Sequence, residues 1–175
     1  MFIGDAASSS AGITLRTNLS GGGGCGSCHS PSQTLGVAFS GSTSVPYGVA
    51  SNFSINVSGA NTGQNIGINV AVSGGTLGES ATNLQISGGE LTHTGTLATT
   101  SGTNGIATGG YSFTFTPAVA AVAGTTYTLA GAARVDTEWN HAANVTLTVV
   151  RGTQAALTAR IGGSSFPAAS NVGLT

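Results

Sequence analysis

Short runs in which apolar and polar residues alternate recur along the chain, and Gly, Ser, Asn or Pro bounds most of them. Residues 53–57 and 111–115 show the pattern most clearly, as Phe-Ser-Ile-Asn-Val and Tyr-Ser-Phe-Thr-Phe. Successive side chains of a strand point to opposite faces, so one face of each run is expected in the core and the other in water. Regularly spaced runs of this kind are typical of an antiparallel sandwich or barrel.

The pattern predicts an all-β fold. The expected strands span residues 13–19, 35–40, 52–58, 66–73, 83–87, 111–116, 126–133, 144–150 and 155–161. Two Gly-, Ser- and Thr-rich segments, 21–34 and 95–110, carry no strand pattern and are expected to be long loops. Residues 117–123, which are rich in Ala and Val, are expected to form a loop that crosses between two sheets.

Charged side chains are scarce in this chain. They make up 5% of its 175 residues, Lys is absent, and the formal net charge is −1. This excludes a nucleic-acid or acidic-membrane surface built on a basic patch. A net charge near zero favours association, so we expect an assembly. No apolar run approaches the ~18 residues of a membrane span, and no signal peptide opens the sequence, so export would imply a mature form.

The motif that carries chemistry is Cys25-Gly-Ser-Cys28-His29. A C-x-x-C-H sequence is the attachment site of a c-type haem. The two thiols form thioethers with the vinyl-derived carbons of the porphyrin, and the adjacent His becomes an axial ligand of the iron. The sequence therefore predicts one covalently attached haem c per chain.

Two other interpretations of this motif remain open. A redox C-x-x-C normally opens a helix after a strand, whereas here the motif follows four glycines in an all-β chain. A zinc site would need further ligands, for which only His93 and His141 remain. Haem is favoured over zinc and over a disulfide or free thiols.

The sixth ligand of a haem iron would come from Met1, His93 or His141. Met1 opens the chain and is a poor candidate, so a second histidine is expected. Two histidines would give a saturated iron suited to electron transfer and would disfavour oxygen or peroxide chemistry. Both histidines stay open at this point, and the one not used could ligate the haem of a neighbouring copy.

Two further residues are candidates for contact with a haem. Arg134 could pair with a haem propionate or with Asp136. Trp139, the only Trp, is expected in the core or at a sheet edge, with a place over the porphyrin as the alternative.

The order of several segments resembles the secreted bacterial choice-of-anchor V domain, a Reeler-like module. The matching pieces are Cys25–His29, Val45-Pro-Tyr-Gly48 before Phe53–Val57, Gly88-Gly-Glu-Leu-Thr-His93-Thr94, Tyr111–Phe115 with Pro117, and Tyr127–Gly131. The resemblance implies an immunoglobulin-like β-sandwich with a haem-binding N-terminal loop. It also implies Cys25, Cys28 and His29 as haem-attaching residues and His93 as the distal ligand. His141 is the alternative that the choice of available ligands leaves.

The resemblance divides the chain into three parts. Residues 1–20 form an N-terminal arm, residues 21–151 the haem-binding sandwich and residues 152–175 a C-terminal tail. The tail lacks the sorting or anchoring segment that the family would lead us to expect.

These features lead us to expect an exported, extracellular or cell-surface mono-haem c-type cytochrome that transfers electrons and is not an enzyme. Residues 13–19 and 155–161 could each add a strand to the sheet of the next copy and build a homopolymeric filament, or pair within their own sheet. The alternative function is a structural surface fibre or adhesion module in which haem or zinc only staples a loop. A haem sensor or peroxidase would require an open coordination position.

Overall fold

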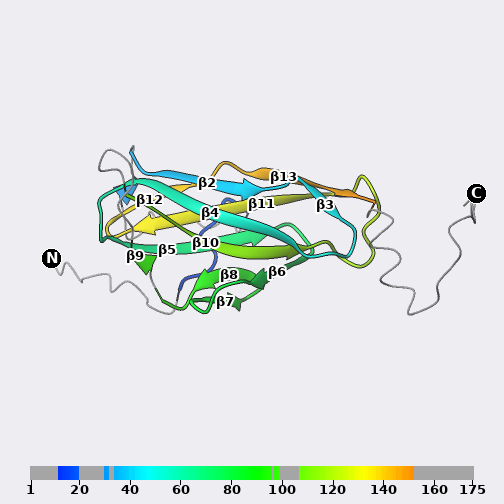
Figure 1. Cartoon of the computed structure of the whole chain (residues 1–175), viewed down its shortest axis with the longest axis horizontal. Coiled ribbons are helices and arrows are strands. Elements are labelled where there is room, and N and C mark those ends of the chain that lie inside the picture. The colour runs from blue at the N-terminus through cyan, green and yellow to red at the C-terminus, as the bar shows by residue number, and fades with distance from the viewer. Residues whose placement is uncertain (1–11, 20–29, 32–33, 96, 99–106, 152–175) are drawn as a thin grey trace, which may run out of the picture.

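The chain folds into two β-sheets that pack face to face as an immunoglobulin-like sandwich (Figure 1). The structure is a computed structural model, and it describes residues 12–19, 30–31, 34–95, 97–98 and 107–151. The prediction of an all-β sandwich is confirmed. Among the described residues no helix is long and apolar enough to cross a membrane.

The larger sheet, sheet A, has the strand order β1-β12-β11-β5-β8-β7, with β13 paired to β11, β3 to β13 and β9 to β5. Its strands are β1 (Ser30–Pro31), β3 (Ser44–Pro46), β5 (Asn65–Val72), β7 (Leu84–Ser87), β8 (Glu90–His93), β9 (Leu97–Ala98), β11 (Thr126–Val135), β12 (Glu138–His141) and β13 (Val145–Val150). Sheet B has the order β2-β4-β10-β6. Its strands are β2 (Gly36–Gly41), β4 (Ser51–Ala60), β6 (Thr76–Glu79) and β10 (Ala107–Thr116). Pairing is antiparallel except for two short parallel pairs, β1 with β12 and β3 with β13.

The core lies between the sheets, where alternate residues of the long strands meet. Phe53 of β4 stacks on Phe113 of β10 with ring centroids 5.9 Å apart, and both side chains are buried. The two sheets are in close contact at Gly131 of β11, where an added Cβ would lie 2.6 Å from Cζ of Phe39 in sheet B. The alternate apolar residues from which β4 and β10 were predicted are therefore the residues that fill the core.

Seven of the predicted strands are confirmed, as β2, β4, β5, β7, β10, β11 and β13. Residues 117–123 connect β10 of sheet B to β11 of sheet A, as expected of a loop that crosses between sheets. The predicted strand 155–161 and the predicted tail 152–175 lie outside the described residues.

The sequence prediction missed the shortest strands: β1, β3, β6, β8, β9 and β12, none longer than four residues. It also placed loops over residues 21–34 and 95–110, which contain β1, β9 and the first residues of β10. With the exception of the four-residue β7, segments this short did not show a recognisable period of two. Their stability comes from neighbouring strands that are distant in sequence.

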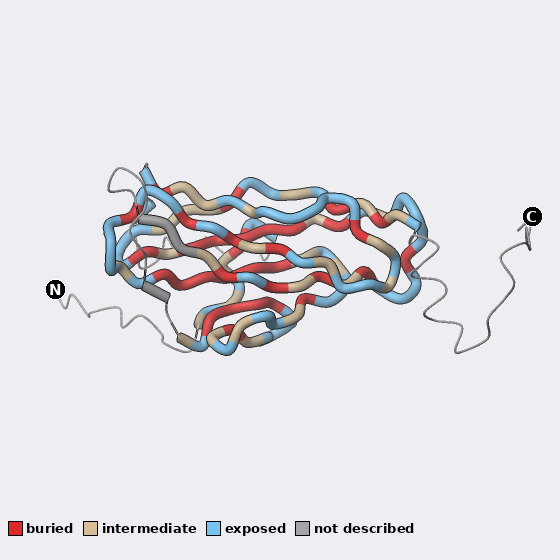
Figure 2. Tube along the Cα trace, viewed as in Figure 1, coloured by how far each residue is buried: buried red, intermediate tan, exposed pale blue. Residues whose placement is uncertain are grey.

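The predicted strand 13–19 is wrong. Residues 12–19, which we call the strap, contain no strand and instead cross the outer face of sheet A. The strap is the dark blue segment that passes behind the sheets in Figure 1. All four residues of β8 and six consecutive residues of β5 are buried (Figure 2), and the strap covers Glu90, Thr92 and Asn69 of these strands on the outer face.

Candidate functional site

The haem motif leads directly into the edge of sheet A. The described residues do not include its three functional side chains, those of Cys25, Cys28 and His29. Ser30, which follows the motif, pairs with Glu138 of β12, and Pro31 pairs with Trp139. His29 directly precedes Ser30 in the chain, so the motif is joined covalently to β1, the end strand that lies beside β12.

The strap approaches the same strand from the other side of the motif. The main-chain oxygen of Arg16 lies 3.2 Å from Nε2 of His141, on β12. Three residues later the strap ends at Leu19, and the chain is next described at Ser30 on β1. Both flanks of the motif are therefore attached beside β12.

The outer face of sheet A next to this edge presents a row of unusual residues. Trp139 of β12 pairs with Arg134 of β11, and Arg134 pairs with Gly67 of β5. Residues in register on neighbouring strands share a face, so these three lie side by side. Trp139 is half-buried and lies next to the end strand β1, so of the two expected places, the core or a sheet edge, it takes the one at the edge; it packs edge-on against His141 with ring centroids 4.7 Å apart.

His93 ends β8, and its imidazole lies beside the main chain of β5. Nδ1 is 3.0 Å from the nitrogen and 3.2 Å from the oxygen of Ile68, and the residue is 7% exposed. A bare Nδ1 accepts the Ile68 N–H, whereas a protonated Nδ1 donates to the Ile68 carbonyl. In the second state the lone pair is on Nε2, and a backbone carbonyl that accepts from the other ring nitrogen is typical of metal-bound histidines. The position of His93 is thus compatible with two roles: holding the main chain of β5 by a hydrogen bond, or binding a metal ion through Nε2.

The ring of His93 occupies the space that a side chain at position 67 would take. A Cβ added to Gly67 would lie 2.7 Å from Cε1 and 3.0 Å from Nε2 of His93. Real Cβ atoms do not approach ring atoms so closely, since interiors are packed to van der Waals contact. Glycine at position 67 therefore permits the observed position of His93.

His141 lies in a different environment from His93. Its Nε2 must carry the proton, because its partner is the Arg16 carbonyl oxygen, which can only accept. The two histidines lie on β12 and β8, with β11 and β5 between them. That separation is three strand spacings of about 4.8 Å each, so one metal ion, with ligands at about 2 Å, can bind only one of them.

Buried polar side chains hold the strap on the sheet. Glu90 Oε2 accepts hydrogen bonds from the Leu15 N–H at 2.6 Å and from Nδ2 of Asn69 at 2.9 Å. Asn69 Oδ1 in turn accepts the Arg16 N–H at 2.8 Å. Glu90 and Asn69 are 8% and 3% exposed, so these acceptors have left water to bind the main chain of the strap.

Thr92 and Thr17 complete the contact. Thr92 Oγ1 accepts the Ile13 N–H at 3.2 Å and donates to the Ile68 carbonyl at 2.9 Å. Thr17 is fully buried. Sequence reasoning did not assign roles to Glu90, Asn69 or Thr92, although a glutamate in the Glu-Leu-Thr-His run of so weakly charged a chain was a signal.

Replacing Glu90 by Ala is expected to loosen the strap. The Leu15 N–H and the Asn69 amide would each lose an acceptor, and hydrogen bonds to a charged group contribute about 1.5–3 kcal/mol. We expect faster hydrogen exchange at the Leu15 and Arg16 amides and a lower free energy of unfolding. Glu138→Ala, which removes an exposed carboxylate on β12, is the matched control. Unchanged protection of the Leu15 amide would contradict this account of the strap.

Replacing Gly67 by Ala is expected to displace the His93 ring. Overpacking of this kind destabilises by about 1–3 kcal/mol, which denaturant unfolding would measure. Gly95→Ala is the control, because a Cβ there would meet nothing closer than 4.0 Å. Equal stabilities of the two variants would show that the contact between Gly67 and His93 is not tight.

Arg134 does not form the pair with Asp136 that the sequence left open. The Asp136 carboxylate accepts instead from Nε2 of Gln64 at 3.0 Å and from the N–H of Asn65 at 3.2 Å. Arg134 Nε is buried and has no hydrogen-bond partner among the described residues. An unsatisfied buried donor of this kind is rare in proteins.

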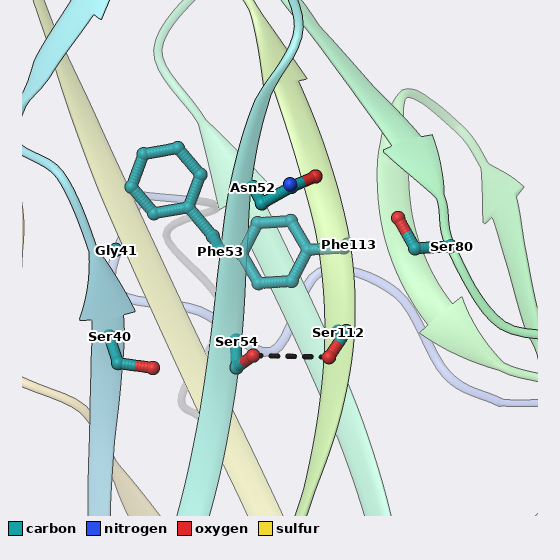
Figure 3. Close-up of a pocket in the computed structure, with 8 residues that line it drawn as sticks. All are labelled: Ser40, Gly41, Asn52, Phe53, Ser54, Ser80, Ser112 and Phe113. Atoms are coloured by element: carbon teal, nitrogen blue, oxygen red, sulfur yellow. Dashed lines mark hydrogen bonds between the residues drawn. The ribbon is translucent and has the colours of Figure 1, made fainter.

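Sheet B carries a second candidate, a shallow depression of about 340 Å³ on its outer face (Figure 3). Serine hydroxyls line it, and those of Ser54 and Ser112 lie 3.1 Å apart. The aromatic residues beside it, Phe53 and Phe113, are buried in the core and offer no ring face to a ligand. The depression therefore lacks both the charge and the apolar surface of a typical ligand pocket.

Within the described ranges, no three His, Cys, Asp or Glu side chains gather closely enough to hold a metal ion. The structure thus places His93 and His141 on the outer face of sheet A but does not bring them together. Their relation to Cys25, Cys28 and His29 lies outside the described residues.

No protein-family model and no curated protein sequence matches this chain. Among solved structures, the CARDB domain of the PF1109 protein from Pyrococcus furiosus, crystallised in complex with di-metal ions, is 15% identical with a TM-score of 0.41, over 66% of this chain and 87% of that one. The sporulation control protein Spo0M from Bacillus subtilis is 14% identical with a TM-score of 0.34, over 69% and 51%. A PapD-like domain of human CEP192 is 9% identical with a TM-score of 0.36, over 70% and 89%. At this level of similarity we carry no function over from any of them.

Proposed function

We propose that this chain is an extracellular mono-haem c-type cytochrome that transfers electrons, and that it is related to the secreted choice-of-anchor V modules it resembles. The observation that carries the proposal is the Cys25-Gly-Ser-Cys28-His29 sequence, which uses both cysteines of the chain. Covalent haem attachment takes place outside the cytoplasmic membrane, so the proposal includes export.

In this proposal Cys25 and Cys28 hold the haem through thioether bonds and His29 is the proximal ligand. A bound haem c supplies a reversible one-electron centre. The outer face of sheet A beside β12 has groups that fit such a molecule. Trp139 offers half-exposed aromatic surface, and the half-buried Arg134 beside it carries a guanidinium, the group that pairs best with a carboxylate such as a propionate.

His93 is the proposed distal ligand and His141 the alternative. His93 is supported by the main-chain carbonyl of Ile68, 3.2 Å from Nδ1, which can fix the ring with Nε2 as the ligating atom. His141 is nearer in the fold to Ser30, but its Nε2 is committed to Arg16. Ligation by His141 would require Nδ1 or release of the strap.

Electron transfer over distance requires copies whose haems come close, so we further propose a homopolymeric filament. Near-neutral surfaces associate with little repulsion, and the chain is 5% charged. Addition of residues 13–19 as a strand is no longer part of the proposal, since the strap is anchored to its own sheet A. Addition of residues 155–161 remains.

The test is spectroelectrochemistry on the full chain, produced in a host that exports proteins and attaches haem c. An electron carrier titrates reversibly as a one-electron centre and exchanges electrons between copies. A haem or zinc that only staples a loop gives no reversible exchange, and that result would favour the alternative of a structural surface fibre or adhesion module.

A further inference from the structure

Large apolar side chains that stay exposed gather in two places. Seven of the eight among the described residues fall into two groups. The first, which we call the end patch, comprises Tyr47, Val49, Val119 and Val122. The second, the strap stripe, comprises Ile13, Leu15 and Leu19. Exposed apolar groups that cluster, unlike scattered ones, indicate an interaction surface.

The end patch is built on two turns at one end of the sandwich, where β3 and β13 end (Figure 1). Tyr47 Oη donates to the Val119 carbonyl at 2.7 Å and so ties the two turns together. Val119 and Val122 are 86% and 68% exposed, and the residues between and beside them are Ala and Gly. The patch is thus apolar, and its backbone is held in place.

The strap stripe is the reverse face of a segment whose main chain is bound to the sheet. The N–H groups of Ile13 and Leu15 point to Thr92 and Glu90, while their side chains are 46% and 60% exposed. Leu15 has a φ of +62°, a left-handed conformation that is costly for a leucine. Strain of this kind persists where the surroundings impose it and often marks a functional segment.

We propose that the end patch of one copy binds the strap stripe of the next. The inference deepens the filament part of the proposed function and rests on it. Both groups are exposed and apolar, so contact between them would remove apolar surface of both from water. The net charge of −1 leaves little electrostatic repulsion between copies. A contact between two different surfaces is heterologous, and copies joined in this way form an open chain unless the rotation closes a ring.

Two double variants and their mixture test the contact. V119S with V122S removes the end patch, and I13S with L15S removes the stripe. All four side chains are exposed, so folding is retained. We expect sedimentation velocity to show concentration-dependent species larger than dimers for the wild-type chain. Each variant alone is expected to be monomeric, with self-association weakened at least about 100-fold by the loss of buried apolar area.

The mixture is the decisive part. An equimolar mixture of the two variants retains one competent junction per pair, so it is expected to give dimers and nothing larger. Ile86→Ser is the matched control, because it removes an exposed apolar side chain that belongs to neither group: Ile86 is 41% exposed. Ile86 pairs with Leu91, which faces the core, so both lie on the side of the sheet away from the strap. This variant is expected to assemble like the wild type.

A monomeric wild type, assembly of either double variant alone, or a mixture that stays monomeric would each overturn the proposal. The Val49→Ser variant weakens the end patch on its other turn and is expected to reduce self-association in the same direction. Haem content is measured on the same samples by pyridine haemochrome. Coloured but monomeric protein would overturn this contact while leaving the cytochrome proposal intact, and colourless protein that assembles would do the opposite.

Discussion

Replacing Cys25 and Cys28 together by Ser is expected to abolish covalent haem. Each thioether needs one of these thiols, and the chain has no other cysteine. The double variant should show no haem stain on a denaturing gel, where only a covalently bound porphyrin remains with the chain. Each single variant retains one thiol and should stain weakly. The measurement is the ratio of haem absorbance to polypeptide.

Ser27→Ala is the control for the cysteine variants, because it changes the motif without removing a thiol or His29. It is expected to stain like the wild type. The core residues of the sandwich lie at or after Leu35, so the cysteine variants are expected to fold. Haem that stays with the doubly substituted chain would contradict attachment through these thiols.

Replacing His93 by Ala is expected to convert a low-spin haem into one that binds CO. A haem with two histidine ligands has no vacancy, whereas loss of the distal imidazole opens one. His141→Ala is the matched control and is expected to keep the low-spin spectrum. Visible spectra of the reduced proteins, with and without CO, make the comparison.

A structural role of His93 must be separated from a ligating one, because Nδ1 also contacts the main chain of Ile68. Loss of the imidazole is expected to cost about 1–3 kcal/mol of stability, whichever role it has. His93→Gln keeps a group that can hydrogen-bond there, so it should restore part of the stability but not the low-spin spectrum. A high-spin His141→Ala with an unchanged His93→Ala would make His141 the distal ligand.

The long strands could be predicted from sequence because their local pattern and their tertiary environment agree. Phe113 alternates with hydroxyl residues, and the same alternation sets which face of β10 meets the core. The short strands β12 and β8 could not be predicted, because they owe their positions to pairing with β11 and β5.

The strap shows why a strand-like pattern can mislead. Residues 13–19 carry alternating apolar residues, yet their N–H groups find acceptors in the side chains of Glu90 and Asn69, more than fifty residues away. Local propensity contains no information about such partners. The apolar residues of the segment point away from the sheet, opposite to the usual interpretation of an apolar stripe.

Some features of the candidate site could likewise be predicted from the sequence, and others could not. The haem motif is read directly from five consecutive residues, since its spacing reflects covalent chemistry. The contact of His93 with Ile68, its need for Gly67 and the buried Nε of Arg134 arise from strands that are adjacent only in the fold. These features required the structure.

The central claim is a covalent haem with two strong axial ligands. Its most direct test is the visible spectrum of the purified full chain, oxidised and then reduced with dithionite, with a pyridine haemochrome assay and a CO challenge. We predict a c-type haemochrome, sharp α and β bands in the reduced protein, and no shift on addition of CO. A colourless protein would contradict the account, and a strong CO shift would contradict the two-ligand iron.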